Sequence, residues 1–202
     1  EKKEMRRSPR RPCLFHSVLL VAWPVWALSS SVCPLREANG TVACDVVELE
    51  VAELVVFREL VFFQQQGETL FRGKGGALRA EGPTRLLRVE SFSLRVENVT
   101  LDGGSADVGG CVLVTNGASF EVSSSTFRNC VADWGGAIAA VSATRVTIDS
   151  TLCVDTLASL DGGAVYASSE TIALETLGGT SFLRTSSAAG DGGAIASAAA
   201  ST

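Results

Sequence analysis

Five of the seven double glycines in the chain are each followed by a small residue and then by an aliphatic one. These segments begin at Gly75, Gly109, Gly135, Gly162 and Gly192, at intervals of 34, 26, 27 and 30 residues. Periods of this length are typical of repeat architectures, in which each unit buries its apolar face against the next unit. The spacing therefore predicts a stack of similar units.

Each unit holds three short pieces of strand length, separated by small turn residues. Val146 and Ile148, for example, alternate with Thr147 and Asp149, which is the period of a half-buried strand. No unit offers a helical stripe. Three strands and three turns in about 26 residues make one coil of a parallel β-helix. We expect an all-β, right-handed parallel β-helix of about five coils.

Stacked coils place equivalent side chains in ladders along the axis. One predicted inward ladder contains Leu101, Phe127, Leu152 and Phe182. A second contains Val112, Ile138, Val165 and Ile195.

The double glycines are predicted to form the corners of the coils. A corner demands a positive φ or a close backbone approach, and glycine supplies both without a Cβ clash. A phosphate-binding loop is the alternative, but neither a GxGxxG pattern nor a Walker pattern is present. The expected corner residues are Gly75, Gly76, Gly109, Gly110, Gly135, Gly136, Gly162, Gly163, Gly192 and Gly193.

An aspartate accompanies each later corner. Asp107 and Asp133 stand two residues before the glycines, and Asp161 and Asp191 stand directly before them. Such a row of carboxylates could bind calcium, but the nonapeptide repeat of calcium-binding β-rolls is missing. We favour aspartates that cap turns, and we assign no metal ligand.

The GGA(I/L/V) segments resemble the repeat of the chlamydial polymorphic outer membrane proteins, over roughly residues 70–202. Cys111 replaces the alanine once. The second mark of that family, FxxN, is poorly matched, because Cys130 stands at the fourth position from Phe127 and Asn129 comes one residue early. The resemblance implies a secreted, cell-surface or outer-membrane β-helix, often adhesive.

The N-terminal segment is typical of a secretory signal peptide over residues 5–29. A basic stretch precedes an apolar run from Leu14 to Leu28, and Val25 and Ala27 suit the positions before a cleavage site. An uncleaved membrane anchor is the alternative.

The net charge is −5 for the whole chain and −9 without residues 1–29. This acidity argues against nucleic acid as a partner, and we expect membrane attachment only through an anchor outside this chain.

Cysteines and sequons fit an exported chain. Cys33 and Cys44 bracket a polar loop and are a candidate disulfide. Cys111, Cys130 and Cys153 are interpreted as small buried residues, at least one of them unpaired within the chain. Asn39 and Asn98 each begin an Asn-x-Thr sequon and are candidate glycosylation sites.

The chain is expected to divide into the signal peptide, an N-terminal cap with first strands at residues 30–69, and repeats at 70–202. Residues 45–63 favour strands, with an amphipathic helix as the alternative. The interval of 34 residues from Gly75 to Gly109 is interpreted as an enlarged coil, which contains two strand-like runs within residues 85–101. Residues 197–202 belong to a new repeat unit that is incomplete, and we therefore interpret the chain as a fragment.

The function class is predicted to be structural or adhesive, with an extracellular protein or glycan as partner. A polysaccharide-active enzyme of the pectin lyase type is the alternative, with its active site outside this chain. His16 is the sole histidine and lies in the predicted signal peptide. We therefore assign no catalytic residue and no cofactor, and expect a secreted or cell-surface location.

Overall fold

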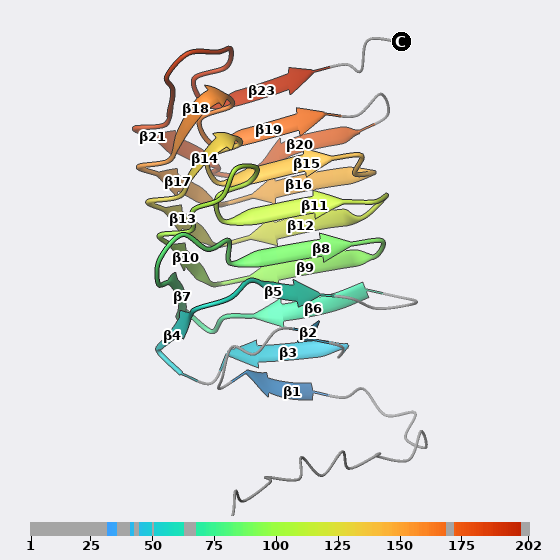
Figure 1. Cartoon of the computed structure of the whole chain (residues 1–202). Coiled ribbons are helices and arrows are strands. Elements are labelled where there is room, and N and C mark those ends of the chain that lie inside the picture. Colours follow the sequence, from blue (N-terminus) through green and yellow to red (C-terminus); the bar gives the residue numbers. More distant parts are fainter. Residues whose placement is uncertain are drawn as a thin grey trace, which may run out of the picture.

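The computed structural model is a right-handed parallel β-helix of about six turns, where the sequence predicted about five. It describes residues 32–35, 41–42, 45–49, 51–62, 68–168 and 172–198, and within these ranges it contains strands and turns but no helix. The coils stack along one axis, with β1 at one end and β23 at the other (Figure 1).

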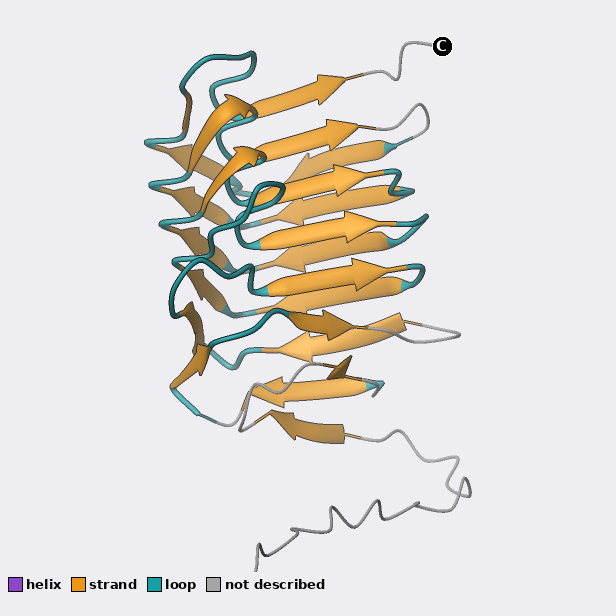
Figure 2. Cartoon of the chain, viewed as in Figure 1, coloured by secondary structure: helices purple, strands orange, loops and turns teal. Residues whose placement is uncertain are grey.

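The strands form four parallel sheets, which run along the stack and are joined by short loops (Figure 2). Sheet A consists of β1 (Val32–Leu35), β3 (Val46–Leu49), β6 (Glu68–Arg72), β9 (Ser93–Glu97), β12 (Ser119–Ser123), β16 (Arg145–Asp149) and β20 (Ala173–Leu177). Sheet B consists of β2 (Thr41–Val42), β5 (Leu60–Phe62), β8 (Leu87–Glu90), β11 (Val112–Thr115), β15 (Ile138–Val141), β19 (Val165–Ser168) and β23 (Ile195–Ala198). Sheet C consists of β4 (Glu53–Val56), β7 (Ala77–Ala80), β10 (Thr100–Asp102), β13 (Thr126–Arg128), β17 (Leu152–Val154) and β21 (Ser181–Leu183).

The later coils contribute a strand to a fourth sheet, which the sequence did not predict. Sheet D consists of β14 (Val131–Trp134), β18 (Leu157–Asp161) and β22 (Ser186–Ser187), and it lies between sheets C and B in the later coils. Two isolated bridges, from Ser105 to Val131 and from Val108 to Trp134, extend it by one coil. The later coils therefore have four strands rather than three.

Inward side chains form the core, as period-2 alternation requires. The predicted ladder of Val112, Ile138, Val165 and Ile195 is confirmed, because these residues are successive register partners in sheet B. Leu87 extends the ladder by one coil. Of these residues, Ile195 is only partly buried and the others are fully buried.

The other predicted ladder is wrong at one position. The register runs from Leu101 to Phe127, Cys153 and Phe182. Cys153 is fully buried, whereas Leu152 is the partner of Thr126 and is half-buried. The preceding Thr151 fills the corner, where its hydroxyl donates to the Asp149 carbonyl at 2.7 Å.

The first double glycine occupies a different corner from the other four. Gly75 and Gly76 lie between β6 and β7, where the coil passes from sheet A to sheet C. The later pairs lie directly before strands of sheet B. The interval of 34 therefore reflects a change of corner and not an enlarged coil, because Leu87 pairs with Val112 only 25 residues further on.

The strands between residues 32 and 62 belong to the same sheets as the repeats. β3 pairs in parallel with β6, β4 with β7 and β5 with β8. The expectation of strands rather than a helix is thus confirmed for the described residues between 45 and 62, and the solenoid begins before residue 70. The predicted signal peptide lies outside the described residues.

Candidate functional site

The first glycine of each later pair is required by its backbone conformation. Gly109, Gly135, Gly162 and Gly192 have φ between +63° and +69°. A Cβ at Gly135 would also lie 2.2 Å from the carbonyl oxygen of Ile138. At these corners neither the dihedral nor the space suits an L side chain.

The second glycine is required by the next coil. A Cβ at Gly110 would lie 2.4 Å from the carbonyl oxygen of Gly136, and one at Gly136 would lie 2.2 Å from that of Gly163. Gly163 meets Gly193 in the same way, also at 2.2 Å. Gly193 has nothing within 4 Å. The stacking of one coil on the next thus excludes side chains along this row.

Arg85 occupies this corner one coil before the row begins. Its Nε donates to the carbonyl oxygens of Val108 at 3.1 Å and Gly109 at 3.0 Å, and Nη2 donates to Val108 at 2.7 Å. Nη1 bonds the Glu59 carboxylate at 2.8 Å. Burial lowers the pKa of Arg85, and Glu59 opposes that effect. The guanidinium therefore donates to the carbonyl oxygens of Val108 and Gly109, at the end of the row where the preceding coil has no glycine pair.

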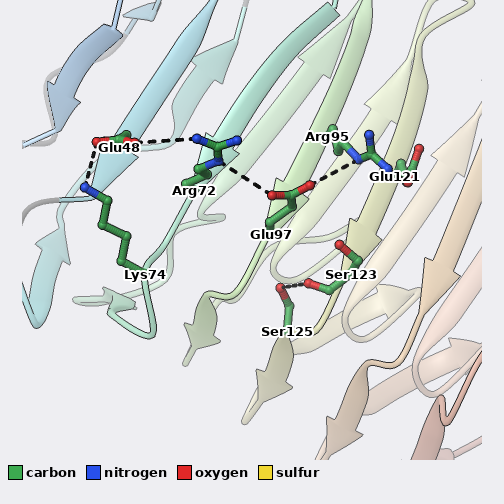
Figure 3. A network of polar contacts seen from close by, with 8 residues as sticks. All are labelled: Glu48, Arg72, Lys74, Arg95, Glu97, Glu121, Ser123 and Ser125. Carbon is green, nitrogen blue, oxygen red and sulfur yellow. Dashed lines mark hydrogen bonds and ion pairs between the residues drawn. The ribbon is translucent and has the colours of Figure 1, made fainter.

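The outer face of sheet A carries a ladder of alternating charge across successive strands (Figure 3). Glu48 accepts from Lys74 at 2.7 Å and lies 3.8 Å from Arg72. Arg72 lies 3.7 Å from Glu97 on its other side. Each exposed pair stabilises the fold by roughly 0–1 kcal/mol. The ladder uses its charges internally and leaves little net charge for a ligand.

The ladder continues toward the later coils. Arg95 lies 3.4 Å from Glu97 and bonds Glu121 at 2.7 Å. Beneath it, Ser125 donates to the carbonyl oxygen of Ser123 at 2.8 Å, so the corner hydroxyl is satisfied locally (Figure 3). Arg145 and Glu175 form a further pair at 3.0 Å.

Sheet C also pairs its charges. The nearly buried Asp102 accepts from Arg128 at 3.0 Å and from Asn129 at 2.8 Å, both in the next coil. One coil further on, Arg184 bonds Asp155, with Nη2 2.7 Å from Oδ2. The hydrogen bond from Arg184 lowers the pKa of Asp155, and the same pair raises the pKa of Arg184.

The corner aspartates form two short rows rather than one. Asp133 donates its backbone N–H to the carbonyl of Asp107, and its carboxylate accepts from Ser159. Asp161 accepts from the backbone N–H of Asp191 at 2.7 Å. A bulge between β14 and β18 separates the rows, which explains why the distance to the glycines changes. Asp161 therefore caps the next coil and not its own turn. Among the described residues, no group of three or more His, Cys, Asp or Glu side chains is placed to hold a metal ion.

Cys111 and Cys130 form a disulfide with an S–S distance of 2.04 Å, so two of the three cysteines interpreted as buried thiols are bonded. Cys153 remains a free, buried thiol. The bond joins the residue after one glycine corner to the residue before β14. Spacing alone did not reveal it, because the two cysteines are 19 residues apart and meet only through the coil geometry.

Asn98 is exposed at the corner between β9 and β10, with φ of +52°. Its side chain is therefore accessible to a modifying enzyme. Asn39, Cys44 and the side chain of Cys33 lie outside the described residues, so the disulfide and the glycosylation site expected there stay predictions.

Residues with positive φ mark the remaining corners, which the sequence analysis missed. Lys74, Asn98, Ser124 and Ser150 share one corner, and Ser91, Asn116 and Ser142 share another. Asn129, Asp155 and Arg184 share the corner between sheets C and D. Asparagine and aspartate tolerate this conformation better than most residues, so some of these corners carry a weak sequence signal, but serine and arginine carry none.

The chain matches no protein-family model, no curated protein and no solved structure. Among the described residues, no helix has the length and apolar character needed to span a bilayer.

Proposed function

We propose that this chain is a secreted or cell-surface β-helix with a structural or adhesive role and no catalytic activity. The observation that carries the proposal is the register of the outer faces. In sheet A, for example, Ser93, Ser119 and Arg145 are successive partners, and all three are at least partly exposed. Such a surface repeats at the strand spacing of about 4.8 Å and suits many weak contacts that add up.

The cysteine bond favours an extracellular setting. Disulfides persist in oxidising compartments and are rare in reducing ones, and Cys111 is bonded to Cys130 in the middle of the stack. The resemblance to a bacterial surface repeat and the N-terminal segment at residues 5–29 point in the same direction. The exposed side chain of Asn98 fits a glycosylated surface if the producing cell glycosylates such sequons.

The test is a binding screen of the full chain against arrays of extracellular proteins and glycans, paired with depolymerisation assays on pectin and alginate. We expect binding without release of reducing ends. Turnover of any of these polysaccharides would contradict the proposal and favour the enzyme. An absence of binding to every immobilised protein and glycan would contradict the adhesive role.

A further inference from the structure

A shallow hollow lies over the outer side of sheet D and the loop that precedes it. It measures about 330 Å³, and its lining crosses several coils, with Pro83 at one end and Leu157 and Ser159 at the other. Val131 and Leu157 form its apolar part. They are register partners in β14 and β18, and their exposed fractions are 42% and 41%. Val131 and Leu157 thus form an apolar step that is exposed to solvent, whereas the outer faces of sheets A and C carry ion pairs.

The rim of this hollow is acidic. Asp107 and Asp133 line it in adjacent coils, and Asp161 and Asp191 form a separate row beyond the bulge between β14 and β18. Residues 103–109, 129–136, 155–163 and 185–193 contain no lysine or arginine. Within the part of the chain that the structure describes, no ion pair involves any of these four aspartates.

The arginines beside the hollow do not balance this charge. Arg85 and Arg88 line a neighbouring hollow that shares Asp107 with this one. Arg85 is committed to Glu59 at 2.8 Å and to backbone carbonyls. Arg88 lies 2.6 Å from Glu90. Arg85 still attracts Asp107 at longer range, but neither arginine forms an ion pair with it, so the rim is less neutralised than the ladder on sheet A.

We propose that this hollow binds a basic, extended polypeptide segment. Cationic side chains of the segment bond Asp107 and Asp133, and an apolar side chain covers Val131 and Leu157. An extended chain laid along the stack meets one coil about every 4.8 Å, so it can reach several coils at once. The inference rests on the proposed adhesive role and names the partner class that this face suits.

The test uses the full chain and a short fluorescein-labelled peptide of Arg, Leu and Gly, with binding followed by anisotropy at low salt. The variant Asp107→Asn/Asp133→Asn removes two charges, and the new amide oxygen at 133 still accepts from Ser159. The matched control, Asp149→Asn/Glu175→Gln, removes the same charge from sheet A. We expect the first variant to weaken binding about fivefold or more, and the control to change it less than twofold.

A second variant separates the apolar contribution. Leu157→Thr places a β-branched residue, a type that favours strands, at an exposed strand position, so the fold is retained. We expect it to weaken binding about threefold while the salt dependence stays the same, because salt screens the aspartates and not the apolar contact. A peptide in which Glu replaces Arg should not bind.

Equal loss in both double variants would overturn the proposal, since it would indicate net charge and not this site. Unchanged binding in Asp107→Asn/Asp133→Asn would overturn it as well. Abolition of peptide binding by millimolar calcium, with calcium itself binding the wild type and not that variant, would assign the rim to a metal instead. These results leave the array screen untouched, so failure of this site and failure of the adhesive role are distinguishable.

Discussion

Arg85 donates a hydrogen bond from Nε to the carbonyl oxygen of Gly109 at 3.0 Å, one coil further along the chain. It stands at the corner where later coils have a glycine, and it bonds the first member of the glycine row. Arg85 thus caps the first end of the glycine row with its side chain, whereas the later glycines pack on the next coil without side chains.

Arg85→Ala should lower the free energy of unfolding by about 2–3 kcal/mol, because it removes charge-assisted hydrogen bonds and leaves Glu59 without its closest cation. Urea unfolding followed by circular dichroism measures the change. Arg79→Ala is the control: Arg79 lies 3.4 Å from Glu53 and its side chain is 60% exposed, so its loss should cost less than about 1 kcal/mol. Equal effects of the two substitutions would show that Arg85 has no special role.

The two glycines Gly136 and Gly193 should respond differently to the same substitution. A Cβ at Gly136 would lie 2.2 Å from the carbonyl oxygen of Gly163, so Gly136→Ala forces adjacent coils apart. We expect a loss of more than about 2 kcal/mol in the free energy of unfolding. Gly193 has nothing within 4 Å, so Gly193→Ala should change stability by less than about 1 kcal/mol. Similar stabilities of the two variants would contradict the stacking argument.

A strand position was predictable from the sequence where a nearby residue type is required by the backbone, and it was not where several residue types fit. The ladder of sheet B was predictable because Ile138 and Val165 stand at a fixed offset from glycines that no other residue can replace. Sheet C was harder, because hydroxyl residues occupy both the corner and the first strand position. Thr151 fills the buried corner that Ser125 fills one coil earlier, whereas the predicted ladder, which matched Leu152 to Phe127, implies that Thr151 matches Thr126.

The site was less predictable than the fold. The aspartates were visible in the sequence, but their division into two rows depends on a bulge between β14 and β18 that leaves no residue signature. The apolar step of Val131 and Leu157 was hidden because both residues also suit a buried strand position. The pairing of Cys111 with Cys130 required the coil geometry.

Removal of the disulfide should destabilise the middle of the stack. The variant Cys111→Ala/Cys130→Ala frees a loop with a sequence separation of 19 residues, for which loop-closure entropy predicts a loss of about 3 kcal/mol. Thermal unfolding with and without dithiothreitol measures the effect. The reductant should lower the melting temperature of the wild type by more than that of the double variant, which keeps only the predicted Cys33–Cys44 bond. A wild type that is indifferent to the reductant would show that the bond is absent or contributes nothing.

Cys153 should make stability fall at alkaline pH. Burial raises the pKa of its thiol from 9.0 to about 12, so the folded state keeps the proton where the unfolded chain loses it. Its contribution to the free energy of unfolding is therefore fully present below pH 9 and lost as the pH rises toward 12. Each pH unit within that window costs about 1.4 kcal/mol at most.

Urea unfolding at intervals from pH 8 to 10.5 measures this loss, with Cys153→Ala as the control. The variant removes the thiol from the buried ladder between Phe127 and Phe182, at a cost that does not depend on pH. The stability difference between wild type and variant should therefore shrink as the pH rises. Iodoacetamide should alkylate Cys153 only as the protein unfolds, because the thiolate is the reactive form and the folded thiol is neutral and buried. Rapid alkylation of the native protein at pH 8, or a stability difference that does not vary with pH, would contradict this placement of Cys153 in the core.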